Sequence, residues 1–138
     1  MKNNLKVSLD VPIRFSEVDS LSIVWHGNYL KYFEDVREEF GRKFGFDYLS
    51  VRDLGYVMPI ITVDLKYKKA IRYGDLLTVN IFYKYSKAAK LCFDYTIQNQ
   101  EQELMCTGYS EQVFLDLNDK LQIIDPPFFK AWKENQNV

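Results

Sequence analysis

The stretch that decides the fold is FSEVDSLSIVWHGNYLKYFEDVREEFGRKF, residues 15–44. Its second half places apolar side chains at steps of four, three, four and four, at Tyr29, Phe33, Val36, Phe40 and Phe44. This spacing lines one face of an α-helix. We therefore predict a helix over residues 29–44, with Asn28 as its N-cap and Gly45 as the residue that ends it. A helix about 25 Å long needs a large apolar partner surface.

The segments around this helix have the pattern of strands. Apolar and polar residues alternate over residues 5–15, 61–67, 77–83 and 91–97, as in strands with one buried face. Two further strands are predicted over residues 104–117 and 121–124, before a short helix that starts at the Pro126-Pro127 pair and a loose tail from residue 134. Because tight turns join the later strands, we expect antiparallel pairing and an α+β fold in one domain, residues 1–138.

Composition narrows the classes of function. The chain has 138 residues and a formal net charge of -1, so no global basic field points to a nucleic-acid partner. No apolar run approaches the ~20 residues of a membrane span, and the N-terminus lacks a signal-peptide pattern, so we expect a cytoplasmic protein without a membrane partner. Cys92 and Cys106 fall in predicted strands and are expected to be reduced and buried. With one histidine and no clustered cysteines, no metal site is predicted.

Asp19 and the single histidine, His26, lie in the loop just before the predicted helix. The first amides of a helix lack intrahelical partners and carry the positive end of its dipole. They stabilise negative charge that develops nearby, while an adjacent carboxylate can attack a carbonyl or deprotonate water. The alternative interpretation of Asp19 is an Asx-turn residue in a polar loop.

Residues 19–29 resemble the hot-dog-fold acyl-CoA thioesterases of the 4-hydroxybenzoyl-CoA thioesterase type. Members of that family have an aspartate at the place of Asp19, a His or Tyr at the place of His26, and the Asn-Tyr pair that stands here at Asn28 and Tyr29.

Two further segments extend the resemblance to roughly residues 11–129. Residues 32–38, YFEDVRE, are similar to the family's Phe-Glu-x-x-Arg helix segment, and residues 72–76, RYGDL, resemble its Tyr-Gly-Asp turn. The chain departs from the family at Ser22, where a glycine is usual, and this loop position is expected to favour a positive φ.

The resemblance implies a hot-dog fold, in which a long central helix is wrapped by an antiparallel sheet of about five or six strands. It also implies a homodimer or homotetramer whose subunits join their sheets, with active sites at the subunit boundary. The implied reaction is hydrolysis of an acyl-CoA thioester to a free acid and coenzyme A. No cofactor is implied beyond the coenzyme A of the substrate.

The resemblance also assigns roles to residues. Asp19 would be the nucleophile or the general base, and the backbone amide of His26 would polarise the thioester carbonyl. The imidazole of His26 could orient water or protonate the leaving thiolate, and it could equally be a loop side chain without a role in catalysis. Tyr29 would shape the substrate pocket or begin the helix.

Four lysines are candidates for binding the phosphates of coenzyme A. They come from two basic clusters and are Lys66, Lys68, Lys87 and Lys90. Lysine can make charge-assisted bonds to phosphate, although charged residues on strands are commonly the solvated face of a sheet.

Two other functions fit the same resemblance. One is a thioesterase that takes its acyl group from an acyl carrier protein, and the other is a hot-dog module that binds an acyl thioester without cleaving it. Rates on the two carriers would separate the first case, and tight binding without turnover would indicate the second. The sequence does not identify the acyl group.

Overall fold

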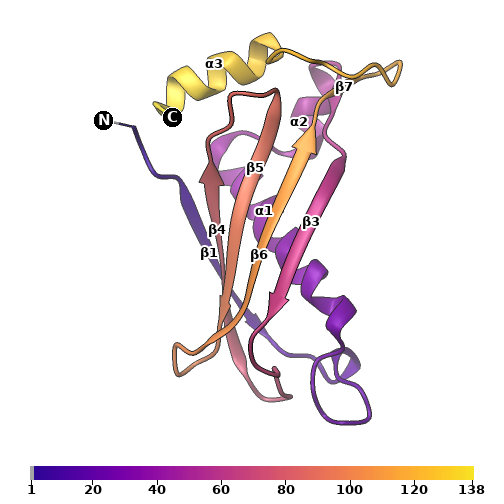
Figure 1. Ribbon diagram of the computed structural model, residues 1–138, viewed down its shortest axis with the longest axis vertical. Helices are drawn as coiled ribbons and strands as arrows, with labels where there is room; N and C mark the ends of the chain where they lie inside the picture. Colours follow the sequence, from indigo (N-terminus) through magenta and orange to yellow (C-terminus); the bar gives the residue numbers. More distant parts are fainter. Residues whose placement is uncertain (1) are drawn as a thin grey trace.

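The computed structural model describes residues 2–138 as a five-stranded antiparallel sheet with a long helix across one face (Figure 1). The strands lie in the order β1-β4-β5-β6-β3. Their bounds are β1 Lys6–Pro12, β3 Ile60–Tyr67, β4 Leu76–Lys84, β5 Lys90–Gln98 and β6 Leu104–Val113. A second, two-stranded sheet pairs β2 Tyr56–Val57 with β7 Leu115–Asp116. The helices are α1 Tyr29–Phe44, α2 Tyr48–Asp53 and α3 Pro127–Gln136. The predicted α+β hot-dog architecture is confirmed.

The core lies between α1 and the sheet because both present one apolar face. On α1 the buried side chains include Tyr29, Phe33, Val36 and Phe40, as the helical spacing predicts. The ring of Phe33 stacks on that of Tyr95 from β5, with centroids 4.3 Å apart. Aromatic rings supply large apolar area at such contacts, so one helix can close the whole inner face of the sheet.

The predicted end of α1 is confirmed, and its predicted start needs a correction. Gly45 has φ 83° and ends the helix, as expected of a residue without a Cβ. Asn28 does not cap with its side chain, because Nδ2 donates instead to Glu17 O at 2.8 Å. A 3₁₀ turn, His26–Asn28, precedes α1 and moves the first unbonded amides back to the loop.

Three sequence-based boundaries near the C-terminus are wrong. The predicted strand at 104–117 is interrupted at Phe114, after which β7 turns away to pair with β2. The predicted strand at 121–124 is only one isolated bridge, between Leu121 and Leu115. The predicted loose tail from residue 134 begins inside α3, which continues to Gln136. Each error arises where pairing partners distant in sequence decide the local structure.

β3 forms an open edge of the main sheet. Its eight residues carry several exposed apolar side chains, among them Ile61 at 51% and Tyr67 at 50%. A long, flat, apolar edge presents unpaired backbone groups that can accept another strand. Within residues 2–138, no helix has the length and apolar character required to cross a membrane.

Candidate active site

A cleft of about 310 Å³ opens where the loop before α1 meets the end of β3. Asp19 and His26 line it from the loop, Tyr29 lines it from the first turn of α1, and Tyr67 and Lys68 close the opposite wall. The structure therefore brings both predicted catalytic residues to one cleft. The N-terminal end of α1 and the C-terminal end of β3 lie at the same end of the molecule (Figure 1).

The loop that carries Asp19 is held by its own backbone. Asp19 N donates to Ile23 O at 2.8 Å, and Ser22 N donates to Asp19 O at 3.0 Å. Ser22 has φ 62°, which confirms that this position requires the left-handed region even with a serine. The departure from the usual glycine therefore leaves the loop conformation in place, at a cost of about 1–2 kcal/mol for a residue with a Cβ.

Both interpretations of Asp19 are visible in the geometry. Its Oδ1 accepts a hydrogen bond from Leu21 N at 2.8 Å, which is the Asx-turn contact. Its Oδ2 has no hydrogen-bond partner within residues 2–138, and the side chain is exposed on the cleft. The turn fixes one oxygen of the carboxylate and leaves the other available to a ligand.

Two backbone amides at the helical start are unbonded. Asn28 N donates to Trp25 O and Tyr29 N donates to His26 O, which begins the hydrogen-bond ladder at residue 28. The amides of His26 and Gly27 precede that ladder and have no acceptor within the described chain. They carry the positive end of the α1 dipole, so they can stabilise an oxyanion at the cleft.

Contacts from Glu17 and Trp25 fix this turn. Glu17 O accepts from both Trp25 N at 3.0 Å and Asn28 Nδ2 at 2.8 Å. The Trp25 ring lies so close to Gly27 that an added Cβ there would meet a ring atom at 2.1 Å. A glycine is therefore needed at this position for the indole to fold over the turn.

Tyr67 is a site residue that the sequence reasoning missed. Its Oη donates to His26 O at 3.1 Å, and its ring packs edge to face on Tyr29 with centroids 4.8 Å apart. The signal was present in the alternation of β3, in which Tyr67 follows Leu65 on the inner face. The position of the helical start beside that strand could not be obtained from local sequence.

Two other titratable groups beside the cleft stay neutral near pH 7. Burial raises the pKa of Tyr29 to about 12, against a smaller lowering by a backbone hydrogen bond from Ile71. Burial also raises the pKa of the Cys106 thiol to about 11. Since the thiolate is the reactive form of cysteine, the Cys106 thiol is a poor nucleophile.

The four candidate lysines are not gathered at one place. Lys68 lines the cleft, and Lys66 lies outside it in a separate hollow beside Asp64 and Tyr109. Lys87 and Lys90 belong to the β4–β5 end of the sheet, which is the end opposite to the cleft (Figure 1). Lys90 Nζ is also 3.3 Å from Glu111 Oε1. Phosphate binding by these four lysines stays a prediction, and within one chain only Lys68 borders the cleft.

Comparison with known proteins now identifies the family. The family model described as the Thioesterase-like superfamily matches residues 13–133, which include the cleft and every strand of the main sheet except β1. The chain belongs to the Thioesterase-like superfamily. The predicted family, and with it the assignment to a class of thioester-hydrolysing enzymes, is confirmed.

Relatives in this superfamily cover most of the chain. A 1,4-dihydroxy-2-naphthoyl-CoA hydrolase of Prochlorococcus marinus is 26% identical over 133 residues, covering 91% of this chain and 87% of the relative. The crystal structure of the DHNA-CoA thioesterase of Staphylococcus aureus has a TM-score of 0.82 and 29% identity, over 94% of this chain and 87% of that one. A 4-hydroxybenzoyl-CoA thioesterase variant with bound 4-hydroxybenzoyl-CoA has a TM-score of 0.79 at 18% identity, over 92% and 97%. This last similarity shows the fold alone.

Proposed function

We propose that this member of the Thioesterase-like superfamily hydrolyses acyl-CoA thioesters in the cleft at the start of α1. The observation that carries the proposal is that Asp19 and His26 line one cleft: Asp19 Oδ2 has no hydrogen-bond partner within residues 2–138, and neither does the amide of His26 or that of the adjacent Gly27. The names of relatives that act on CoA thioesters support the choice of substrate class. The reaction requires no cofactor, and we place it in the cytoplasm.

The chemistry can follow two routes from the same geometry. In the first, Asp19 attacks the thioester carbonyl, the C–S bond breaks, and coenzyme A leaves as a thiolate that takes up a proton. Water then hydrolyses the mixed anhydride. In the second, Asp19 accepts a proton from water, the water oxygen attacks the carbonyl, and the same C–S bond breaks. In both routes the amides of His26 and Gly27 hold the oxyanion.

Replacement of Asp19 by Asn tests the assignment. We expect a loss of about 10²- to 10⁴-fold in kcat for release of the coenzyme A thiol, because the amide side chain neither attacks nor accepts the proton. The melting temperature should stay within a few degrees, since Asn can keep the contact to Leu21 N. Turnover close to that of the wild type would contradict the role of Asp19.

Isotope labelling can detect the anhydride route. Turnover in H₂¹⁸O places ¹⁸O in the Asp19 carboxylate only when an anhydride forms and water attacks its enzyme side. Mass spectrometry of the peptide that contains Asp19 detects this label. In the general-base route the label is found in the released acid alone.

A homodimer joined at β3 is part of the proposal. β3 is an unpaired edge with exposed apolar side chains, and its end at Tyr67 forms a wall of the cleft. Pairing of two such edges would satisfy the free backbone groups of both. Replacing exposed Ile61 by Glu should shift the protein toward a monomer in light scattering, and an unchanged assembly would contradict this interface.

A further inference from the structure

The flank of α1 that faces β6 and β3 carries polar side chains that the proposed reaction does not use. Arg37 Nη1 donates to Tyr95 Oη at 3.0 Å, and Tyr95 Oη lies 2.6 Å from Ser110 Oγ. Tyr95 and Ser110 are each only 1% exposed, whereas Arg37 is half-buried. The buried hydroxyl pair fixes one edge of the guanidinium. Of its five N–H donors, only this one is bonded within residues 2–138.

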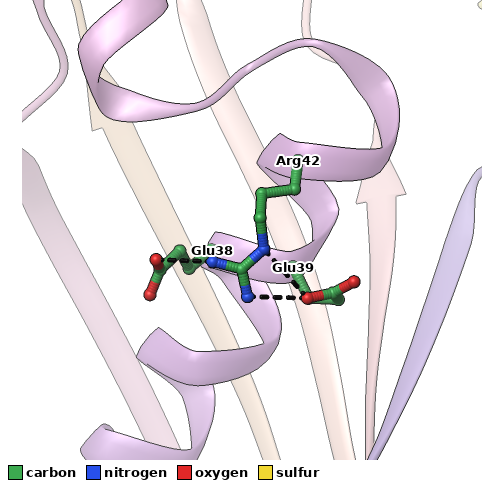
Figure 2. Close-up of polar contacts among 3 residues, drawn as sticks. All are labelled: Glu38, Glu39 and Arg42. Carbon is green, nitrogen blue, oxygen red and sulfur yellow. Dashed lines mark hydrogen bonds and ion pairs between the residues drawn. The ribbon is translucent and has the colours of Figure 1, made fainter.

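The charge of Arg37 is not balanced by a neighbouring carboxylate. Arg42, one turn further along α1, contacts Glu38 and Glu39 at 2.7 Å each on the solvent side (Figure 2). In the part of the chain that the structure describes, Arg37 has no ion pair at all. A guanidinium held half-buried without a counter-charge is a ready partner for an incoming carboxylate, which it can bind through two parallel N–H bonds.

Arg37 faces a small cavity of about 120 Å³. Leu30, Phe33 and Val63 supply apolar walls, and Arg37 and Ser110 supply polar ones. The volume holds several water molecules or the end of a ligand. A cavity with apolar walls and one cation suits the end of a ligand that is hydrocarbon along its length and anionic at its tip.

The cavity lies on the same seam between α1 and β3 as the cleft. Leu30 directly follows Tyr29 of the cleft on α1, and Val63 precedes Tyr67 of the cleft by four residues on β3. Arg37 is eight residues beyond Tyr29, about 12 Å along the helix axis. Helical side chains lean toward the helix N-terminus, so the guanidinium lies closer to the cleft than its backbone does.

We infer that Arg37 is a specificity residue that binds a carboxylate at the far end of the acyl group. On this inference, which rests on the proposed function, the favoured substrates are CoA thioesters of dicarboxylic acids. The thioester lies between Asp19 and the amides of His26 and Gly27, and the hydrocarbon segment follows the seam past Leu30 and Phe33. Tyr95 and Ser110 are positioning residues, since they act through Arg37.

Glu34 is the one carboxylate among the residues that line the cavity. It is exposed and makes no ion pair with Arg37 in the described structure. Water screens an exposed charge, so its repulsion of a bound carboxylate is small beside the direct contact with the guanidinium. Binding of a carboxylate of a second copy by Arg37 is the competing outcome, because the cavity adjoins the open edge of β3.

The test compares matched pairs of thioesters on the wild type and on Arg37→Met. Each pair has the same chain length, with and without a terminal carboxylate, such as hexanedioyl-CoA with hexanoyl-CoA and octanedioyl-CoA with octanoyl-CoA. In the wild type we expect kcat/KM to favour the carboxylate by about tenfold to a hundredfold at the best length, as for a hydrogen-bonded charge pair. Arg37→Met should reduce this ratio to 1 or below and leave the plain thioesters within about twofold. Arg37→Lys, which keeps the charge without the fork, should be intermediate.

Arg42→Met is the matched control, because it removes an arginine from the same helix on the solvent side, and it should leave the ratio unchanged. No preference for the carboxylate in the wild type, or an equal loss on both thioesters in Arg37→Met, would overturn the inference. A monomeric Arg37→Met protein would show that the arginine serves the contact between copies. If the wild type cleaves no thioester, the proposed function fails, and calorimetric affinities for the same pairs then decide whether Arg37 selects the carboxylate.

Discussion

The two ends of α1 are built in opposite ways. At the C-terminal end two of the last four carbonyls are bonded: Gly41 O accepts from Gly45 N and Phe46 N, and Phe44 O accepts from Trp132 Nε1 at 2.6 Å. At the N-terminal end the amides of His26 and Gly27 have no acceptor within residues 2–138, and His26 lines the open cleft. Every helix has unsatisfied groups at both ends. Here one end is closed for stability, and the other is left available for a ligand.

Side-chain burial also differs between the second half of α1 and the loop before its first turn. Phe40 is fully buried, and its ring lies within 5 Å of those of Phe44 and Phe93, at 4.7 and 4.8 Å. Asp19 and His26 are both exposed. Buried side chains along α1 anchor the helix, and the loop before its first turn presents the carboxylate and the backbone donors to the cleft.

The largest expected effect on stability is at the closed end. Phe40→Ala should lower the free energy of unfolding by about 3–5 kcal/mol, because the lost ring leaves a cavity among other aromatic side chains. Chemical denaturation measures it. Arg42→Ala on the solvent face is the control and should cost at most about 0.5 kcal/mol. Similar losses in the two variants would contradict the division between the ends.

At the N-terminal end of α1, two variants can separate the contributions of the backbone amide and the side chain of His26 to catalysis. His26→Pro removes the amide N–H while proline is tolerated at the first position of a helical turn, and His26→Ala keeps the amide. We expect kcat to fall by about 10²- to 10³-fold more in His26→Pro than in His26→Ala, as for the loss of one oxyanion donor. Both variants lose the ring contact to Tyr67, so an equal decrease would assign the effect to the imidazole.

A smaller loss of stability is expected at Gly45, the left-handed residue at the C-terminal end of α1. Gly45→Ala should destabilise by about 1 kcal/mol, since φ 83° penalises a Cβ more than the reduced freedom of the unfolded chain compensates. No atom lies within 4 Å of the added Cβ, so the effect is conformational alone. Thermal unfolding checks the magnitude, and an unchanged melting temperature would contradict it.

The same preference of positive φ for glycine predicts a gain in stability at Ser22, in the loop before α1. Ser22→Gly should stabilise by roughly 0.5–1 kcal/mol, because glycine removes the strain of φ 62° and loses part of this gain through a freer unfolded chain. Hydrolysis should stay within about twofold of the wild type, since the loop already has this conformation. A destabilised Ser22→Gly protein would show that the serine has a contact that outweighs its strain.

Sequence periodicity predicted most of the fold. The apolar stripe placed α1 within its observed bounds, and alternation located four of the five strands of the main sheet. Both signals are local, because each follows from the repeat of one element. The errors fell at Asn28 and at residues 121–124, where a contact to Glu17 and the absence of a strand partner decided the structure.

The sequence by itself determined that a carboxylate and a helix start stand close together, because Asp19 and His26 are seven residues apart in one short loop. It also predicted that Gly45 ends the helix, where the left-handed φ suits a residue without a Cβ. Only the tertiary structure decided that Tyr67 holds that helix start and that Lys68, rather than Lys87, borders the cleft. It likewise joined Arg37 to Tyr95 across 58 positions. The physical reason is that strand register and helix docking bring together residues whose separation along the chain carries no signal of their contact.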